Sequence, residues 1–125
     1  MDWLVVVFAS LAALLHVGFF VLEAVLWKRP AVHRIFGART PEQAELLSPA
    51  FFNLGFYNLF LGIGTGVGVW LWLDRGQVAL LVFGLLFMVG AAQVLRSRSP
   101  RMWRGTLIQG VAPLLALLIL AIESF

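Results

Sequence analysis

The chain has 125 residues, of which 62% are hydrophobic and only 12% charged, and its formal net charge is +3. Soluble globular domains carry about one-quarter charged residues, so this composition excludes a soluble globule and indicates a membrane protein. The sequence contains no cysteine, which excludes disulfides, thiolate metal sites, iron–sulfur clusters and catalytic thiols.

Four long apolar stretches dominate the sequence. They predict membrane-spanning helices over residues 3–27, 50–73, 78–95 and 103–122. Each is close to the ~20 residues that cross about 30 Å of hydrocarbon. The connections are too short for a second domain, so we expect a single transmembrane domain over residues 1–125, folded as an all-α integral membrane four-helix bundle. The first stretch should be retained, because it is longer than the core of a signal peptide and follows Asp2 instead of a basic residue.

The basic residues are concentrated in two of the three connections. The first holds Lys28, Arg29, Arg34 and Arg39, the third holds Arg96, Arg98, Arg101 and Arg104, and the second holds only Arg75. By the positive-inside rule, the first and third connections should lie in the cytoplasm and both termini on the extracytoplasmic side. Anionic lipid headgroups at the cytoplasmic face are the expected partners of these side chains, and nucleic acid is not expected.

The first connection is the only one long enough for structure of its own. Thr40-Pro41-Glu42-Gln43 has the pattern of a helix N-cap, a proline at the first helical position and a glutamine that can reach back. It predicts a short interfacial helix over residues 41–47, and Ser48-Pro49 repeats the capping pattern at the start of the next span. His33 lies among arginines, and we expect it to be solvated or to face lipid headgroups.

Two ionisable residues, His16 and Glu23, interrupt the first apolar stretch. Ionising an acid in a medium of low dielectric is costly, so a glutamate in a span indicates a functional site. The two residues are seven apart and share one helix face with Ala9, Ala12 and Trp27, which we expect to pack against protein. Glu23 and His16 are therefore candidate acid–base residues, about 10 Å apart along the axis. A neutral core histidine is the more common role for His16 taken alone.

Five neutral polar residues of the other spans are candidate ligand-binding residues: Asn53, Tyr57, Asn58, Gln93 and Gln109. Counted inward from the basic connections, they lie with Glu23 in the cytoplasmic half of the bilayer. The four spans thus predict one polar layer. For each amide, a hydrogen bond that ties two helices together is an equally good interpretation, and Tyr57 could be an interfacial aromatic.

Helical spacing predicts which faces of the last three spans point inward. It groups Gln93 with Ala79, Phe83, Leu86 and Gly90 on the third, and Gln109 with Ala112, Pro113, Ala116 and Leu120 on the fourth. Pro113 has no N–H for the carbonyl of Gln109, which becomes a free acceptor. In the second span, Gly55, Gly62 and Gly66 should lie on one side and Gly64 and Gly68 on another. Such small residues predict close contacts with neighbouring helices on both sides.

Many of these residues stand in blocks that resemble a known family. The blocks are His16 to Trp27, Phe36-Gly37, Asn53 to Gly62 and Gly90 to Gln93. They are similar to the small bacterial membrane proteins of the family called domain of unknown function 1304. The resemblance implies four spanning helices, a shared polar set and a multi-pass location in the bacterial plasma (inner) membrane, but no activity. Leu54 stands where the family usually has glutamine, so no mechanism that needs that amide is implied.

Two functional classes remain open, beside a non-catalytic membrane scaffold. The first is a cytoplasm-facing polar pocket that binds a small lipophilic molecule, with or without acid–base chemistry at Glu23 and His16. The second is a proton-coupled transporter, since small multidrug resistance exporters also have four helices and a glutamate in the first. The one-sided charge distribution argues against the antiparallel pairing of such exporters.

The sequence points to no particular cofactor. One buried histidine and one carboxylate are too few ligands for a closed metal site, so no metal is expected. Self-association into a homo-oligomer is expected, because a chain of this length leaves much small-residue surface available.

Overall fold

The computed structural model describes residues 2–123, which form helices joined by short turns, with no strand among them. Four helical segments are long and apolar enough to cross a membrane. They are α1 (Asp2–Phe20) continued by the π-helical turn η1 (Val21–Val25), α3 (Pro41–Arg75), α4 (Ala79–Arg98), and the short turn η2 (Pro100–Met102) followed by α5 (Trp103–Glu123). The predicted all-α architecture with four spans is confirmed.

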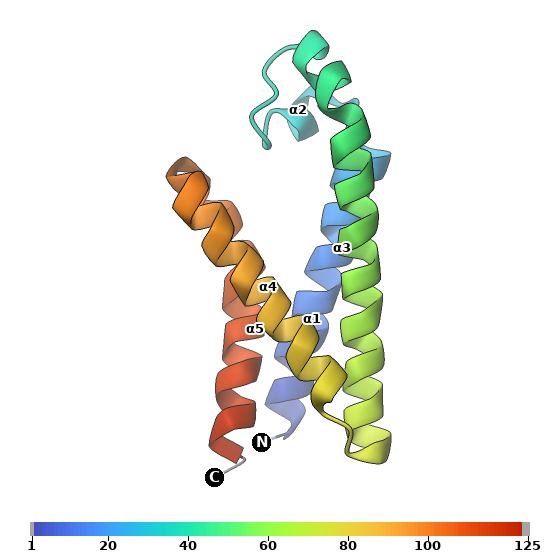
Figure 1. Cartoon of the computed structure of the whole chain (residues 1–125), viewed down its shortest axis with the longest axis vertical. Coiled ribbons are helices and arrows are strands. Elements are labelled where there is room, and N and C mark those ends of the chain that lie inside the picture. The colour runs from blue at the N-terminus through green and yellow to red at the C-terminus, as the bar shows by residue number, and fades with distance from the viewer. Residues whose placement is uncertain (1, 124–125) are drawn as a thin grey trace.

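The two ends of the bundle differ in charge. The first and last described residues lie at one end, which we call the terminal end (Figure 1). The opposite end carries α2 (Pro30–His33) and the turn between α4 and α5. It also holds eight of the nine lysines and arginines, and we call it the basic end.

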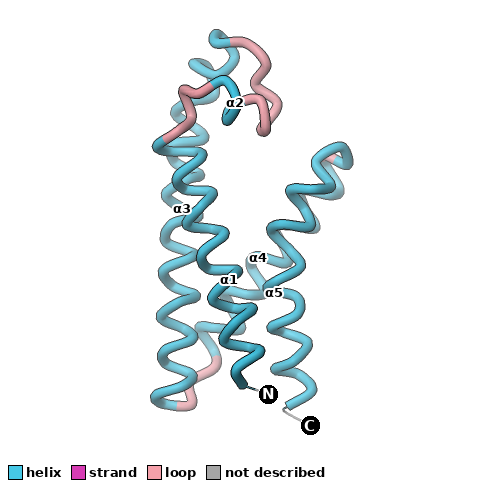
Figure 2. The backbone as a smooth tube through the Cα atoms, turned by 180° about the vertical axis from the view of Figure 1, so that it is seen from behind, coloured by secondary structure: helices cyan, strands magenta, loops and turns pink. Residues whose placement is uncertain are grey.

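The four spans form two pairs that part toward the basic end. α1 packs along α3 and α4 along α5, while contacts of α1 with α5 and of α3 with α4 join the pairs. The pairs diverge toward the basic end (Figure 1 and Figure 2). Accordingly, η1 packs against α3, α1 and α2, whereas η2 packs against α4 and α5. We call the joined part the closed half and the diverging part the fork.

The closed half is held by apolar side chains and by close backbone contacts. Its core consists of Val5, Ala9, Ala12, Val69, Leu81, Leu85, Met88, Ala112, Ala116 and Leu120. A Cβ added at Gly62 would lie 2.8 Å from the carbonyl oxygen of Ala13, and one at Gly68 would lie 2.7 Å from the backbone nitrogen of Leu81. Thus α3 contacts α1 on one side and α4 on another, as the glycine pattern predicted.

Two glycines of that pattern lie elsewhere than predicted. Gly66 was expected to share the contact side of Gly62, and Gly64 that of Gly68, but both have open space around the position of a Cβ, and Gly66 is exposed. Thr65 takes the adjoining contact instead, because its hydroxyl lies against Gly84 of α4. The contact surface of α3 is therefore set by Thr65 as well as by glycine.

α3 begins as predicted but does not stop where predicted. The Thr40 hydroxyl accepts a hydrogen bond from the Gln43 N–H at 3.2 Å, and the Gln43 side-chain oxygen accepts one from the Arg39 N–H at 2.8 Å. Instead of ending at residue 47, the helix continues through Pro49 to Arg75. Pro49 costs one backbone hydrogen bond, which a helix of 35 residues tolerates when tertiary contacts hold both sides of the proline.

Trp27 supplies those contacts. Its indole N–H donates to the Ala44 carbonyl at 2.8 Å, before the proline, and its ring stacks on Phe51, after the proline, at 4.1 Å between centroids. The loop after Trp27 folds over the same ring, so that His33 is only 3% exposed and its Nδ1 lies 2.7 Å from the Ala38 carbonyl oxygen. The expectation that His33 is solvated was therefore wrong.

Candidate functional site

His16 lies on the inward face of α1, which packs against the rest of the bundle. Ala9, Ala12 and His16 are fully buried, and Glu23 and Trp27 are 4% exposed, so the predicted protein-facing stripe is confirmed. Nδ1 of His16 lies 2.8 Å from the Ala12 carbonyl, so in a neutral ring Nδ1 donates and Nε2 is an acceptor. Among the buried side-chain nitrogen and oxygen atoms of residues 2–123, only Nε2 of His16 is found without a partner.

Glu23 lies in the π-helical turn η1. Here the Leu26 N–H donates to the Val21 carbonyl five residues earlier, at 2.9 Å, and such turns are frequent at functional sites. The side-chain amide of Asn58 donates to the Glu23 carboxyl oxygen Oε2 at 2.8 Å. Among the described residues this neutral amide, rather than a basic side chain, is the partner of Glu23.

A close backbone approach places Glu23 against α3. A Cβ added at Gly55 would lie 3.0 Å from the Cβ of Ala24 and 3.2 Å from the Cβ of Glu23. Any larger residue at position 55 would therefore push η1 away from α3. Gly55 lies one turn from Asn58 and so brings the carboxyl and the amide within hydrogen-bonding distance.

Asn58 lies on the same face of α3 as Thr65. This face is packed against α4 in the closed half and continues into the fork. Asn58 lies seven residues before Thr65, and residues seven apart share a helix face. Thr65 is 1% exposed against α4, whereas Asn58, about two turns nearer the basic end, is half-buried.

Gln109 has the same position on α5. The residues predicted to face inward with it, Ala112, Pro113, Ala116 and Leu120, are all buried, which confirms this face. Gln109 extends this face by about one turn toward the basic end and is half-buried. α1 and α5 run in opposite directions. His16 comes about one turn after Ala12, and Gln109 about one turn before Ala112, so both lie on the basic-end side of these alanines.

Two of the other candidate residues lie on the outer face of α3. Asn53 and Tyr57 are exposed, and the Asn53 amide donates to the Tyr57 hydroxyl at 3.2 Å. At 100° per residue they project away from Gly55 and Gly62, the glycines that face α1. The structure therefore does not bring this pair to Glu23.

Gln93 also lies away from the fork. The buried face of α4 consists of Leu81, Gly84, Leu85, Met88 and Ala92. The face predicted from spacing was wrong, because Phe83, Leu86, Gly90 and Gln93 are all exposed. Both faces of this helix are apolar, so the pattern of apolar residues did not distinguish the core from the lipid.

The predicted single polar layer thus separates into three parts. His16, Glu23, Asn58 and Gln109 lie on inward faces at the fork, Asn53 and Tyr57 form a pair on the outer face of α3, and Gln93 is exposed on α4. Residues 2–123 contain no group of three or more metal-ligating His, Cys, Asp or Glu side chains. The fork residues are hydrogen-bonding groups, and Glu23 is the one acid among them.

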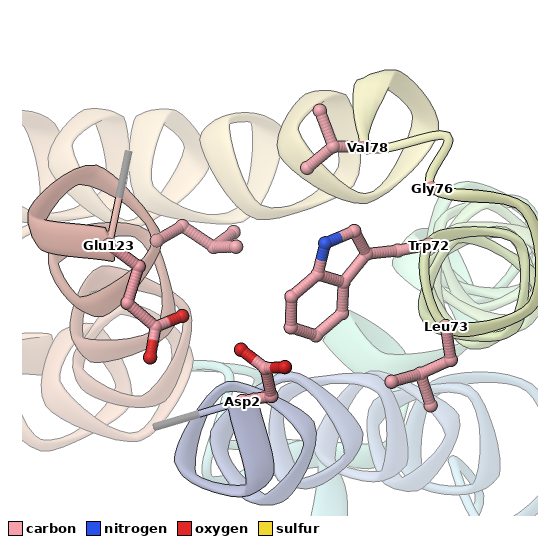
Figure 3. A pocket seen from close by; sticks show the side chains of 7 residues that line it. Asp2, Trp72, Leu73, Gly76, Val78 and Glu123 are labelled. Carbon is pink, nitrogen blue, oxygen red and sulfur yellow. The ribbon is translucent and has the colours of Figure 1, made fainter. Parts of the chain in front are cut away.

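A cavity of about 400 Å³ lies at the terminal end, away from the fork. It is lined by Asp2, Trp72, Leu73, Gly76, Val78, Leu120 and Glu123. Figure 3 shows the Asp2 carboxyl between the indole of Trp72 and the carboxyl of Glu123. This cavity could not be predicted from the sequence, because it forms where the start of α1, the end of α5 and the turn between α3 and α4 meet.

The family of the chain follows from a comparison with family models. The family described as protein of unknown function (DUF1304) matches residues 10–121. The chain belongs to this family. The matched segment includes His16, Glu23, Asn58 and Gln109, and the predicted resemblance to this family is confirmed. No curated protein and no solved structure matches the chain.

Proposed function

We propose that this DUF1304 protein binds a small, partly apolar molecule in the fork, with the Glu23 carboxyl and the amides of Asn58 and Gln109 as polar contacts. The observation that carries the proposal is the change of residue type along the inward faces of three helices. In the closed half these faces carry residues such as Ala12, Thr65 and Ala116. In the fork the same faces continue with Glu23, Asn58 and Gln109.

The energetics of the fork favour an occupant with both an apolar and a polar part. Acyl chains would leave the Gln109 amide, and the hydrogen-bonding groups of Asn58 and Glu23 that their mutual bond does not use, without partners, which is costly in hydrocarbon. A molecule with an apolar body and a carbonyl or hydroxyl head would satisfy them. The hydrogen bond from Asn58 holds one carboxyl oxygen of Glu23 in a fixed direction, which lowers the entropic cost of binding.

The orientation of the protein in the membrane determines from which side a molecule reaches the fork. By the positive-inside rule, the basic end lies in the cytoplasm of a bacterium, and both termini lie across its inner membrane. The fork then opens into the cytoplasmic leaflet between anionic headgroups and the eight basic side chains of that end. A lipophilic molecule could enter it sideways from the bilayer. Such access requires no enclosed aqueous pocket.

His16 extends the proposal to acid–base chemistry. Its Nε2 is a buried acceptor without a partner in residues 2–123, and Glu23 lies seven residues further along the chain, toward the basic end. About 10 Å of axial separation excludes direct proton transfer between them. Any such chemistry would pass through the bound molecule, and it would need both residues.

Binding of a short-chain ubiquinone analogue, and of its quinol, to the protein in lipid nanodiscs tests the proposal. We expect saturable binding that weakens about fivefold or more in Glu23→Leu and Gln109→Leu, since each variant loses one polar contact worth about 1 kcal/mol. The matched variant Gln93→Leu should bind as the unchanged protein does. Equal losses in Gln93→Leu and Gln109→Leu, or only non-saturable partition of both probes into the bilayer, would contradict the fork as the site.

A liposome assay separates binding from transport. If addition of a cationic dye to proteoliposomes releases protons, and Glu23→Gln abolishes the release, the proton-coupled transporter is favoured instead. Saturable binding without proton release supports the binding function.

A further inference from the structure

The outer face of α3 carries a polar pair that no other part of the chain covers in residues 2–123. Tyr57 is 61% exposed, and its hydroxyl accepts a hydrogen bond from the exposed Asn53 amide at 3.2 Å. Both residues lie in the second predicted span, on the side of α3 that faces away from α1. Acyl chains offer no hydrogen bonds to such a pair. The pair therefore favours a polar partner.

We propose that this face of α3 binds the same face of a second copy of the chain, around a two-fold axis parallel to the membrane normal. The hydrogen-bonding inventory of the pair fits such a contact. The bond within the pair uses one amide hydrogen of Asn53, which leaves the Asn53 oxygen as an acceptor and the Tyr57 O–H as a donor. The Tyr57 O–H of each copy can then donate to the Asn53 oxygen of the other.

Symmetry places these groups opposite each other. All copies are inserted with the same orientation, so the same residues lie at the same depth. A two-fold interface is made of the same patch on both copies, and a donor and an acceptor on one patch are satisfied twice. A second copy of the chain therefore satisfies the donor and the acceptor of this pair better than a lipid or an unrelated protein does.

The residues around the pair have the spacing of a helix–helix contact. Asn53, Tyr57, Phe60, Gly64 and Val67 follow one another at intervals of four and three. This is the heptad spacing of helices that cross at about 20°. Phe60 is 62% and Val67 43% exposed, and nothing lies within 4 Å of a Cβ built at Gly64. The seam contains no charged residue, so two copies do not repel each other along it.

Cysteine cross-linking in membranes tests the interface, because the chain has no cysteine of its own. Phe60→Cys lies in the seam and should form a disulfide-linked dimer on mild oxidation. The matched control Phe87→Cys replaces an aromatic residue of α4 with similar exposure, 55% against 62%, and should stay uncross-linked. Equal cross-linking of both variants, or of neither, would overturn the proposal. The second result would mean that headgroups solvate the pair.

A second measurement tests the role of the polar pair itself. Tyr57→Phe keeps the ring and removes the donor, so each dimer loses both interchain bonds. Dimerisation followed by fluorescence energy transfer in lipid vesicles of increasing lipid content should weaken about five- to tenfold. Tyr57 is exposed, so this variant should fold normally. An unchanged dimerisation constant would show that Asn53 and Tyr57 do not form the contact, whatever the outcome of ligand binding at the fork.

Discussion

The closed half and the fork are built from the same helices but differ in what lies on the inward faces. In the closed half, Gly62 and Gly68 let backbones approach closely and Thr65 is the buried polar residue between α3 and α4. In the fork, where the two helix pairs part, the same faces carry an acid and two amides. Polar residues that tie helices together are expected where helices touch, and Glu23 and Asn58 meet that expectation because their hydrogen bond joins η1 to α3. The half-buried Gln109 amide makes no such bond within residues 2–123, and this favours a role in lining a site.

The largest effect should come from filling the close contacts of the closed half. Gly62→Val places a branched side chain against the Ala13 carbonyl, so α1 and α3 must separate. We expect a loss of about 2–3 kcal/mol in the free energy of unfolding. The matched variant Gly66→Val enters open space on the same helix and should change it by less than about 0.5 kcal/mol. Unfolding by sodium dodecyl sulfate in mixed micelles, followed by circular dichroism, measures both. Similar losses in the two variants would show that α1 and α3 are not closely packed here.

A smaller loss is expected from the one side-chain bond that joins Glu23 to Asn58. Asn58→Leu leaves the Glu23 carboxyl, which is 4% exposed, without its donor. This should cost about 2 kcal/mol of unfolding free energy. Replacing both partners, in Glu23→Leu with Asn58→Leu, should restore most of the loss, because neither polar group then remains unsatisfied.

Asn53→Leu is the control for this cycle, since it makes the same change on the outer face of α3. It should change the unfolding free energy of the monomer by less than about 0.5 kcal/mol. A double variant less stable than Asn58→Leu alone would mean that the carboxyl has partners other than Asn58 in the membrane.

The same comparison explains which parts of the structure the sequence could predict. Span number and length follow from apolar runs, because hydrocarbon thickness fixes them. The inward faces of α1 and α5 were predictable because on each a stripe of alanines coincides with a polar residue, His16 on α1 and Gln109 on α5. On α4, leucines and phenylalanines lie on all sides of the helix. In a membrane, an apolar side chain gains no hydrophobic stabilisation from facing protein instead of lipid, so these residues do not indicate which face is buried. On α4 the small residues Gly84 and Ala92 lie at close contacts, but the exposed Gly90 is equally small, so residue size did not identify the buried face either.

The pairing within the site depended on information that a single helix does not contain. Asn53, Tyr57 and Asn58 are near neighbours in sequence, yet one binds Glu23 and the other two lie on the opposite face. The choice depends on how α3 is rotated toward α1, which is set by Gly55 and Gly62. The π-helical turn at Glu23 was equally hidden, since all its other residues are leucine, valine and alanine and suit an α-helix as well.

A change of about 1 kcal/mol is expected from the tryptophan that holds the basic end together. Trp27→Phe keeps an aromatic ring to stack on Phe51 but removes the N–H donor to the Ala44 carbonyl. One neutral hydrogen bond of this kind contributes about 1 kcal/mol. The loss should be local, because Trp27 contacts the loop and the start of α3 rather than the closed half. Amide hydrogen exchange should accelerate in residues 30–44 and stay unchanged around Ala9 and Leu85. Faster exchange in both regions would show that the two halves unfold as one unit.

The smallest effect on stability is expected for two cysteine variants of α5. These variants should nevertheless differ clearly in accessibility to a water-soluble thiol reagent. Gln109→Cys and Val111→Cys are two residues apart on α5, the first on the inward face with Ala112 and the second 45% exposed on the outward face. Each should change the unfolding free energy by less than about 0.5 kcal/mol. A membrane-impermeant maleimide reacts with the thiolate, which requires water, so only Gln109→Cys should be labelled, and only from the basic side. Labelling of neither would mean that acyl chains fill the fork as they surround Val111. The inward and outward faces of α5 would then share one environment, and the polar residues of the fork would have no aqueous or ligand-filled space to line.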